Sequence, residues 1–240
     1  MIEETFDLKF IIDILPKVLK ALPTTLYVTA WSALFGWLFG LVFTFARVSK
    51  HKVLSSAIAV CTTVIRGIPT VVFLYLIYFG LPVLLRGIAG IEISQWEKTT
   101  FVIIAMAFET AISSSEMFRS AYNSLDKGQL EAAHALGMTR VQRFRRIIFP
   151  QGLYVILPNL TSATLALIQA TSLVYTLGVM DVLGKARQIN SNEFGLKSLE
   201  SYIAVALIYW AFSFVITRLF KLLEHWFGRG LKTVASTSGA

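Results

Sequence analysis

Two long stretches without a charged residue constrain the fold of this chain more than any other feature. Residues 21–46 and residues 147–180 contain no Asp, Glu, Lys or Arg. A helix needs about 20 mainly apolar residues to cross the hydrocarbon core of a bilayer, so each stretch is long enough to span a membrane. We therefore expect an all-α integral membrane protein.

The composition supports this class and excludes three others. Of 240 residues, 55% are hydrophobic and 15% are charged, whereas about 25% of residues are charged in soluble domains. So much apolar surface would aggregate on a soluble domain, and it is too abundant for a disordered chain. The net charge of +8 could indicate a nucleic-acid-binding protein, but such proteins are rich in charge. The expected surroundings are a lipid bilayer, with no nucleic acid as partner.

Five membrane-spanning helices are expected. In chain order they occupy residues 24–46, 53–82, 99–118, part of 147–180, and 201–220. As one straight helix, the stretch 147–180 would be about 50 Å long, which exceeds the roughly 30 Å of a bilayer core. Pro150 and Pro158 therefore predict a broken helix at the start of the fourth span, since proline removes a backbone donor.

The charge of the connecting segments predicts the orientation in the membrane. The segments 47–52, 116–146 and 218–240 together hold 13 basic and 4 acidic residues, a net charge of +9. The N-terminal segment and the loops at 86–98 and 181–200 hold 8 basic and 9 acidic residues, a net charge of −1. Because basic loops stay in the cytoplasm, we expect the N-terminus outside and the C-terminus inside.

Two smaller patterns predict local packing. Gly36 and Gly40 form a small-xxx-small pair in the first span, which indicates either a close helix–helix contact or chance. Ahead of that span, five apolar residues share one helical face and predict a short helix on the outer surface, although Pro16 argues against an unbroken one. These residues are Phe10, Ile11, Ile14, Leu15 and Val18.

The sequence carries no enzyme signature. It has no HExxH, GxSxG, CxxC or GxGxxG pattern, and its three histidines fall in three separate segments. The run Gly184-Lys185-Ala186 is similar to the end of a phosphate-binding loop, but Val179 and Ala186 stand where that motif needs Gly and Ser or Thr. We expect a chain that is not an enzyme and has no cofactor of its own, so that a partner or an ion gradient supplies the energy for any transport.

The segment between the third and fourth spans has the most informative local pattern. Residues 131–136 favour helix, Gly137 is a natural C-terminal stop, and Thr139 can cap the next helix. The small side chains of this segment would allow close approach by a groove of another protein, namely Ala132, Ala133 and Ala135. An ordinary solvated basic loop is the alternative, because basic inner loops are common.

This segment resembles the EAA loop of ABC-transporter permease subunits. Glu131-Ala132-Ala133 is followed after three residues by Gly137, and Pro150 comes thirteen residues later. The resemblance implies a coupling helix, in a loop at about 120–150, that sits in a groove of an ABC ATPase subunit. The implied coupling residues are Gly128, Glu131, Ala132, Ala133 and Gly137.

Further motifs resemble the polar amino-acid permeases, the histidine/glutamine/cystine-type importers. Arg66-Gly67-Ile68-Pro69 is similar to their RGTP element, with Ile68 in place of Thr. Thr171-Ser172-Leu173 resembles their D-T-S-L element, with Ala170 in place of the usual Asp or Asn. Two other matching runs are Tyr78-Phe79-Gly80-Leu81-Pro82 and Glu116-Met117-Phe118-Arg119, and the run that looks closest to cystine-type members is Asp181-Val182-Leu183-Gly184-Lys185-Ala186.

The resemblance covers about 24–223 and implies a permease subunit of the bacterial inner membrane. It implies an extracytoplasmic segment at 1–23, a transmembrane domain at 24–223 and a cytoplasmic tail at 224–240. Such subunits work as a homo- or heteromeric pair with ATPase subunits, which bind the ATP and Mg, and receive a polar amino acid, cystine being one candidate, from an extracytoplasmic binding protein. An ion-coupled secondary amino-acid transporter is the alternative, and it would leave the EAA loop unexplained.

Five polar residues within the expected spans are candidates for the substrate path. Arg66 and Glu109 fall near mid-bilayer at 1.5 Å per residue, where charges usually face a cavity or each other. They could pair, offer complementary charge to a zwitterionic amino acid, or only fix helix register, and Pro69 would kink the helix beside Arg66. Three more polar residues would either satisfy the backbone of a broken helix or hydrogen-bond between helices: Gln169, Thr171 and Ser172.

Overall fold

The computed structural model describes residues 6–48 and 52–237, with side chains as far as Phe227. Residues 1–5, 49–51 and 238–240 lie outside this part, so the ends of the expected N-terminal segment and tail, and Lys50 of the first basic loop, are not described. All regular elements of the described residues are helical. They are α1 (Leu8–Leu19), α2 (Leu22–Val48), α3 (Lys52–Arg66), α4 (Thr70–Tyr75), the π-helix η1 (Leu76–Gly80), α5 (Leu81–Ala89), α6 (Lys98–Asn123), α7 (Lys127–Ala135), α8 (Arg140–Arg143), the π-helix η2 (Phe144–Ile148), α9 (Phe149–Ala170), the 3-10 helix η3 (Thr171–Leu177), α10 (Val182–Asn192) and α11 (Ser198–Thr237).

Among the residues that the structure describes, five helical segments are long and apolar enough to cross a membrane, as expected. They are Leu22–Val48, Thr70–Ala89, Lys98–Asn123, Arg140–Leu177 and Ser198–Phe227. The first, third, fourth and fifth segments each contain, or overlap most of, the span expected at that place in the chain. The second lies well to the C-terminal side of its expected position, for a reason given below.

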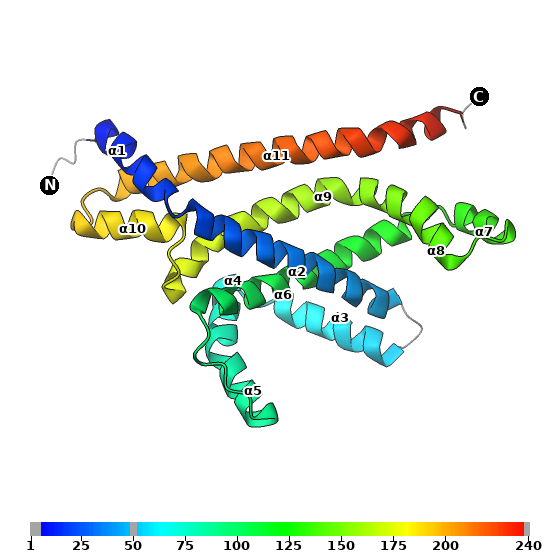
Figure 1. Ribbon diagram of the computed structural model, residues 1–240, viewed down its shortest axis with the longest axis horizontal. Coiled ribbons are helices and arrows are strands. Elements are labelled where there is room, and N and C mark those ends of the chain that lie inside the picture. Colours follow the sequence, from blue (N-terminus) through cyan, green and yellow to red (C-terminus); the bar gives the residue numbers. More distant parts are fainter. Residues whose placement is uncertain (1–5, 49–51, 238–240) are drawn as a thin grey trace.

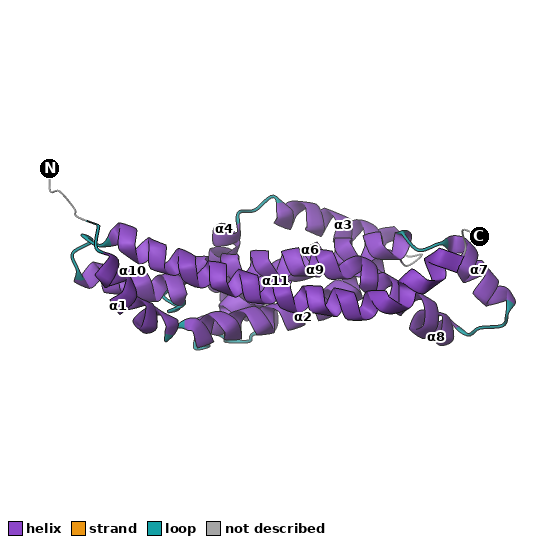
Figure 2. Ribbon diagram, turned by 90° about the horizontal axis from the view of Figure 1, so that it is seen from above, coloured by secondary structure: helices purple, strands orange, loops and turns teal. Residues whose placement is uncertain are grey.

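The long helices lie side by side along one axis of the molecule. Figure 1 shows α2, α6, α9 and α11 along this axis, with α9 running opposite to the other three, and Figure 2 shows the same bundle from above. α1 and α10 lie at one end of the bundle, whereas α7 and α8 project from the other. α5 points away from the bundle axis. The fold therefore has two different ends, one with the short helices α1 and α10 and one with a helical hairpin.

The closest packing in the bundle is between α2 and α6. A Cβ atom added to Gly36 would lie 2.5 Å from Cβ of Thr110, and one added to Gly40 would lie 2.8 Å from Cβ of Ser114. Only glycine permits so close an approach of the two backbones. The helix–helix contact that the Gly36/Gly40 pair predicts is confirmed, and chance is not its explanation.

The prediction that residues 53–82 form one kinked helix is wrong. α3 ends at Arg66, and α4 begins only at Thr70. Between them Pro69 has ψ 136°, outside the helical region, and caps α4 with its backbone alone. Gly67 favours helix weakly and Pro69 excludes the helical conformation from the preceding residue, so the pair ends the helix completely.

The N-terminal helix is continuous through Pro16, contrary to the expectation of a break. Its predicted apolar face is confirmed in part, because Ile11, Ile14 and Val18 are buried against a cluster from α10 and α11. Asp7 caps the helix, since its Oδ1 accepts a hydrogen bond from the backbone N of Phe10 at 3.0 Å. α1 is thus packed on the bundle rather than lying free on a surface.

The fourth span starts with a widened turn instead of the expected break. The π-helix η2 precedes α9, and the backbone N of Phe149 donates to the carbonyl of Phe144, five residues back. Pro150 stands in the first turn of α9, where its missing N–H costs little. Pro158 lies inside α9, which remains helical through it.

Candidate coupling loop and substrate path

The hairpin at the far end of the bundle is made of α7, a turn at Gly137, and α8. Asp126 caps α7, because its Oδ1 accepts a hydrogen bond from the backbone N of Gly128 at 2.8 Å. Gly137 has φ +75°, a left-handed conformation that glycine adopts without cost. The backbone N of Met138 closes the turn on the carbonyl of Ala133 at 3.1 Å, as in a glycine-ended helix. The predicted helix stop at Gly137 is confirmed.

The start of α8 is fixed by a reciprocal cap. The backbone N of Gln142 donates to Oγ1 of Thr139 at 3.2 Å, and the backbone N of Thr139 donates to Oε1 of Gln142 at 2.8 Å. Two backbone donors at the helix start are thereby satisfied. The cap predicted at Thr139 is confirmed, and the turn between α7 and α8 is held from both sides.

The implied coupling residues fall into an exposed group and a buried one. Glu131, Ala132 and Gly137 are exposed, whereas Ala133 is only 4% exposed and packs inward. Leu136, at the tip, has 81% of its surface exposed, and the sequence reasoning did not single it out. Glu131, Ala132 and Leu136 are therefore accessible on the surface of the hairpin.

A side-chain hydrogen bond ties this hairpin to the bundle, and an ion pair joins the nearby ends of α2 and α6. Nε2 of Gln151, in α9, donates to Oε1 of Gln129, in α7, at 2.7 Å. At the adjoining ends of α2 and α6, Glu116 forms an ion pair with Arg47 and a second one with Arg119, whose Nη2 lies 3.0 Å from Oε2. The hairpin is thus anchored to α9, next to helix ends that are held together by charge.

Arg66 and Glu109 do not form the ion pair that was one of the expectations. Within the described residues, none of the ion pairs joins them. Arg66 is the last residue of α3 and is exposed, where its charge complements the negative end of the helix dipole. Glu109 is half-buried in α6, beside the side chain of Thr70, the first residue of α4. Both charges therefore lie at the break between α3 and α4.

Gln169, Thr171 and Ser172 lie where α9 tightens into η3. Gln169 is exposed and Ser172 is half-buried, with its Oγ donating to the carbonyl of Gln169 at 2.7 Å. Thr171 is fully buried, donates to the carbonyl of Ile168 at 2.6 Å and lies 3.4 Å from the hydroxyl of Tyr209. Of the two interpretations left open for Thr171, the bond to the carbonyl of Ile168 favours the one in which its hydroxyl satisfies the backbone where α9 ends.

The helix break and the start of η3 share one apolar cluster. Ile68, from the break, and Leu173, from η3, both pack against it, and its buried core includes Met106 and Val174. The hydroxyl of Tyr75, in α4, also donates to the carbonyl of Thr176 at 3.1 Å. The structure thus brings two discontinuous helices together, an arrangement by which transporters build binding sites.

Next to Thr171 lies a buried hydrogen bond that the sequence reasoning missed. The hydroxyl of Tyr209, in α11, donates to Oδ2 of Asp181 at 3.2 Å. Asp181 is fully buried and caps α10, accepting from the backbone N of Gly184 at 2.8 Å. Burial raises the pKa of Asp181 above its ordinary value, against these hydrogen bonds, which lower it. The only signal in the sequence was an Asp just ahead of a helix.

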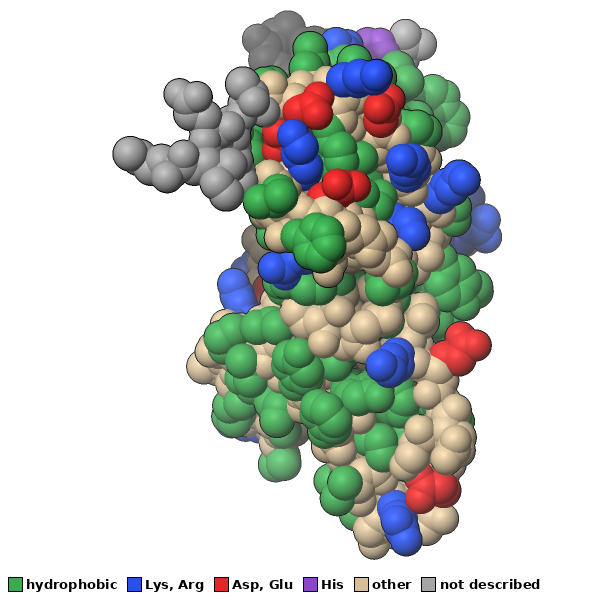
Figure 3. Space-filling view, turned by 90° about the vertical axis from the view of Figure 1, so that its left-hand side faces the viewer, with side chains coloured by type: hydrophobic (Ala, Val, Ile, Leu, Met, Phe, Trp, Pro, Cys, Tyr) green, Lys and Arg blue, Asp and Glu red, His purple; other side chains and the backbone are tan. Residues whose placement is uncertain are grey.

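The opposite end of the bundle carries charges of both signs. Figure 3, seen from the end with α1 and α10, shows acidic and basic side chains interspersed. Among them, Nζ of Lys197 lies 3.4 Å from Oδ2 of Asp7 and 3.7 Å from Oε1 of Glu200. Over the described part of the chain, no three His, Cys, Asp or Glu side chains are placed to hold a metal ion.

Comparisons with known proteins agree on one kind of protein. A family model described as "Binding-protein-dependent transport system inner membrane component" matches residues 21–229. The chain is 36% identical to a probable amino-acid permease protein, YxeN, of Bacillus subtilis (strain 168), over 95% of this chain and 96% of the relative. It is 33% identical to the L-cystine transport system permease protein TcyL of the same organism, over 92% of each chain.

Solved structures give the same result. A structure titled "Crystal structure of an amino acid ABC transporter with histidines" superposes with a TM-score of 0.78 at 29% identity, over 92% of this chain and 99% of that one. An inward-facing structure of the MetNI methionine ABC transporter superposes with a TM-score of 0.66, over 88% of this chain and 95% of that one. Its identity of 17% supports the fold alone.

Proposed function

The chain belongs to the binding-protein-dependent transport system inner membrane components, and from that premise we propose which substrate, partners and orientation it has. It is a membrane permease subunit of amino-acid ABC importers. Its relatives carry the names of permeases for amino acids and for L-cystine. The proposed cargo is a polar amino acid, with cystine as the first candidate, delivered by an extracytoplasmic binding protein.

The observation that carries the proposal is the capped hairpin of α7 and α8, which projects beyond the bundle (Figure 1). Its exposed residues, Glu131, Ala132 and Leu136, are proposed to enter a groove of the ATPase subunit. Gly128 and Gly137 set the start and the end of α7 through backbone geometry, and Ala133 packs the helix inward. ATP and Mg are bound by that partner, so this chain needs no cofactor.

The proposed arrangement in the membrane follows from the two ends of the bundle. The hairpin end, with its net positive segments, faces the cytoplasm of a bacterium, and the end with α1 and α10 faces outward. Residues 1–23 are then extracytoplasmic, residues 24–223 form the transmembrane domain with the coupling loop at about 120–150, and residues 224–240 are a cytoplasmic tail. The mixed charges in Figure 3 would meet the binding protein.

The proposed substrate path runs past the break between α3 and α4. There the guanidinium of Arg66 would bind the carboxylate of a zwitterionic amino acid, and the carboxylate of Glu109 its ammonium group. Gln169 and Ser172 are proposed to line the same path, with Thr171 holding η3 in place from behind. Because Arg66 and Gln169 are exposed on this chain, a second permease subunit, identical or related, would complete the path.

Co-purification with the ATPase tests the coupling role. Gly137 and Gly195 both have a positive φ, +75° and +81°, and an added Cβ would meet nothing within 4 Å at either. Gly137→Val and Gly195→Val therefore impose the same backbone strain at opposite ends of the bundle. We expect Gly137→Val to lose the ATPase partner and Gly195→Val to retain it. Both variants should give equal yields of monodisperse protein, which shows that both fold. Equal retention by both variants would refute the docking role of the hairpin.

An ion-coupled secondary transporter remains the competing function. It would account for the five spans and for charges at a helix break. It gives no reason for a doubly capped hairpin with an exposed leucine at its tip. Uptake that persists without any ATPase would favour it.

A further inference from the structure

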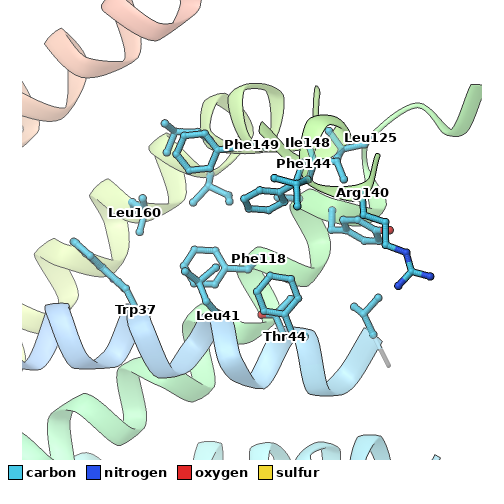
Figure 4. A pocket seen from close by; sticks show the side chains of 18 residues that line it. Trp37, Leu41, Thr44, Phe118, Leu125, Arg140, Phe144, Ile148, Phe149 and Leu160 are labelled. Atoms are coloured by element: carbon cyan, nitrogen blue, oxygen red, sulfur yellow. The ribbon is translucent and has the colours of Figure 1, made fainter. Parts of the chain in front are cut away.

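We propose that the groove between α2, α6 and the η2–α9 segment binds one acyl chain of an anionic phospholipid. The groove encloses about 650 Å³. Figure 4 shows aromatic and aliphatic side chains on both walls, with Leu41 and Phe118 on one side and Phe144 and Phe149 on the other. Such a lining is unsuited to a polar amino acid. Only the choice of leaflet rests on the proposed function, through the orientation of the coupling hairpin.

The length of the groove matches one leaflet of a bilayer. Along α2 its lining runs from Trp37 to Val48, which is about 16 Å at 1.5 Å per residue. Half of a hydrocarbon core of roughly 30 Å is about 15 Å. An extended acyl chain of this length is a slender apolar occupant. A helix of a second subunit is the competing occupant, and the Gly152→Phe variant described below distinguishes the two.

The charge at the end of the groove selects the headgroup. Of the described residues that line it, Arg140 is the one that carries a charge. Figure 4 shows Arg140 and Trp37 at opposite ends, with the guanidinium directed away from the cavity. None of the ion pairs between described side chains involves Arg140 or its neighbours Arg143, Arg145 and Arg146. Unpaired cations at this depth attract anionic headgroups of the cytoplasmic leaflet.

Gly152 shows that the groove is open space and not a gap between touching side chains. It lies in α9, is buried and lines the groove, yet an added Cβ would meet nothing within 4 Å. Because nearly all of the groove lining is apolar, its occupant is expected to be apolar. The occupant would lie beneath η2, the turn that joins the coupling hairpin to α9.

The test measures which lipid the chain retains. The full chain with its co-expressed subunits is reconstituted in vesicles of three parts phosphatidylethanolamine and one part phosphatidylglycerol. It is then extracted with mild detergent, and native mass spectrometry identifies the lipids that remain bound. We expect the ratio of phosphatidylglycerol to phosphatidylethanolamine on this chain to be about five times the ratio in the vesicles, the factor expected for one cation near the surface. Arg140→Gln should abolish the enrichment.

A second variant fills the groove. Gly152→Phe should abolish retention of both lipids without loss of yield, because its side chain enters open space. Gly87→Phe is the matched control. An added Cβ there also meets nothing within 4 Å, but the residue is not part of the groove lining, so this variant should retain lipid like the parent.

The proposal is overturned if the retained lipids match the vesicle composition, if Arg140→Gln changes nothing, or if Gly152→Phe breaks a subunit contact and leaves lipid bound. The readout requires no transport, so its failure and that of the proposed function are separable.

Discussion

The contact between α2 and α6 makes Gly36→Ala the sharpest test of the fold. The new Cβ would lie 2.5 Å from both Cβ and Cγ2 of Thr110 and 3.1 Å from the carbonyl oxygen of Ala107. Carbon atoms normally approach to about 3.5–4.0 Å, so the helices must separate by about 1 Å. No flexible side-chain end is available to move instead, because the clash involves a β-carbon and a backbone oxygen.

The expected cost follows from overpacking and helix propensity. Overpacking a core costs about 1–3 kcal/mol, and a clash this short belongs at the upper end of that range. Alanine favours helix over glycine by about 1 kcal/mol, which offsets part of the cost. We expect Gly36→Ala to lower the free energy of unfolding by about 2 kcal/mol, measured by reversible unfolding in mixed detergent micelles.

Two further variants make this prediction refutable. Gly80→Ala adds the same methyl group where nothing lies within 4 Å, so its stability should equal or exceed that of the parent. Thr110→Gly combined with Gly36→Ala should recover part of the loss, since the two positions are coupled through one contact. Parent-like stability of Gly36→Ala, or an equal loss in Gly80→Ala, would show that the two helices do not pack as described.

Three other outcomes are expected. Tyr209→Phe removes the hydroxyl that donates to the buried carboxylate of Asp181 and should cost about 1–3 kcal/mol in thermal unfolding; an unchanged midpoint would refute this bond. Burial raises the pKa of Asp181 above its ordinary value of 3.8. The contribution of its protonation to stability is therefore present below pH 3.8 and is lost as the pH rises through the raised pKa. Asp181→Asn should flatten this part of the plot of stability against pH, and a plot like that of the parent would contradict the assignment. Glu109→Gln should lower substrate-stimulated uptake roughly tenfold or more, and uptake with unchanged affinity and rate would exclude a binding role.

Local signals in the sequence were enough to predict the turn and the cap of the hairpin formed by α7 and α8. Gly137 and Thr139 act on the backbone within a few residues of themselves, so their chemistry decides the turn whatever surrounds it. The number of spans was also predictable, because the bilayer requires long apolar helices. The close contact at Gly36 and Gly40 needed only a spacing of four residues on one helix.

Other features were predictable only in part or not at all. Pro69 indicated a kink, but the apolar residues on both sides of Arg66 concealed the complete break that Gly67 and Pro69 cause. Thr171 is a polar residue in an apolar helix by sequence, and nothing local indicates that its hydroxyl lies 3.4 Å from that of Tyr209, 38 positions away. α1 continues through Pro16 because its apolar face packs against α10 and α11, a contact that no local pattern specifies.

The energy source of uptake tests the central claim most directly. The chain would be reconstituted in proteoliposomes with its partner ATPase and binding protein, and uptake of radiolabelled cystine and of other polar amino acids would be followed with ATP inside, or with an ion gradient and no ATP. We expect uptake only with ATP and the binding protein, and its loss in Gly137→Val but not in Gly195→Val. Uptake driven by an ion gradient alone would contradict the assignment as an ATP-driven importer.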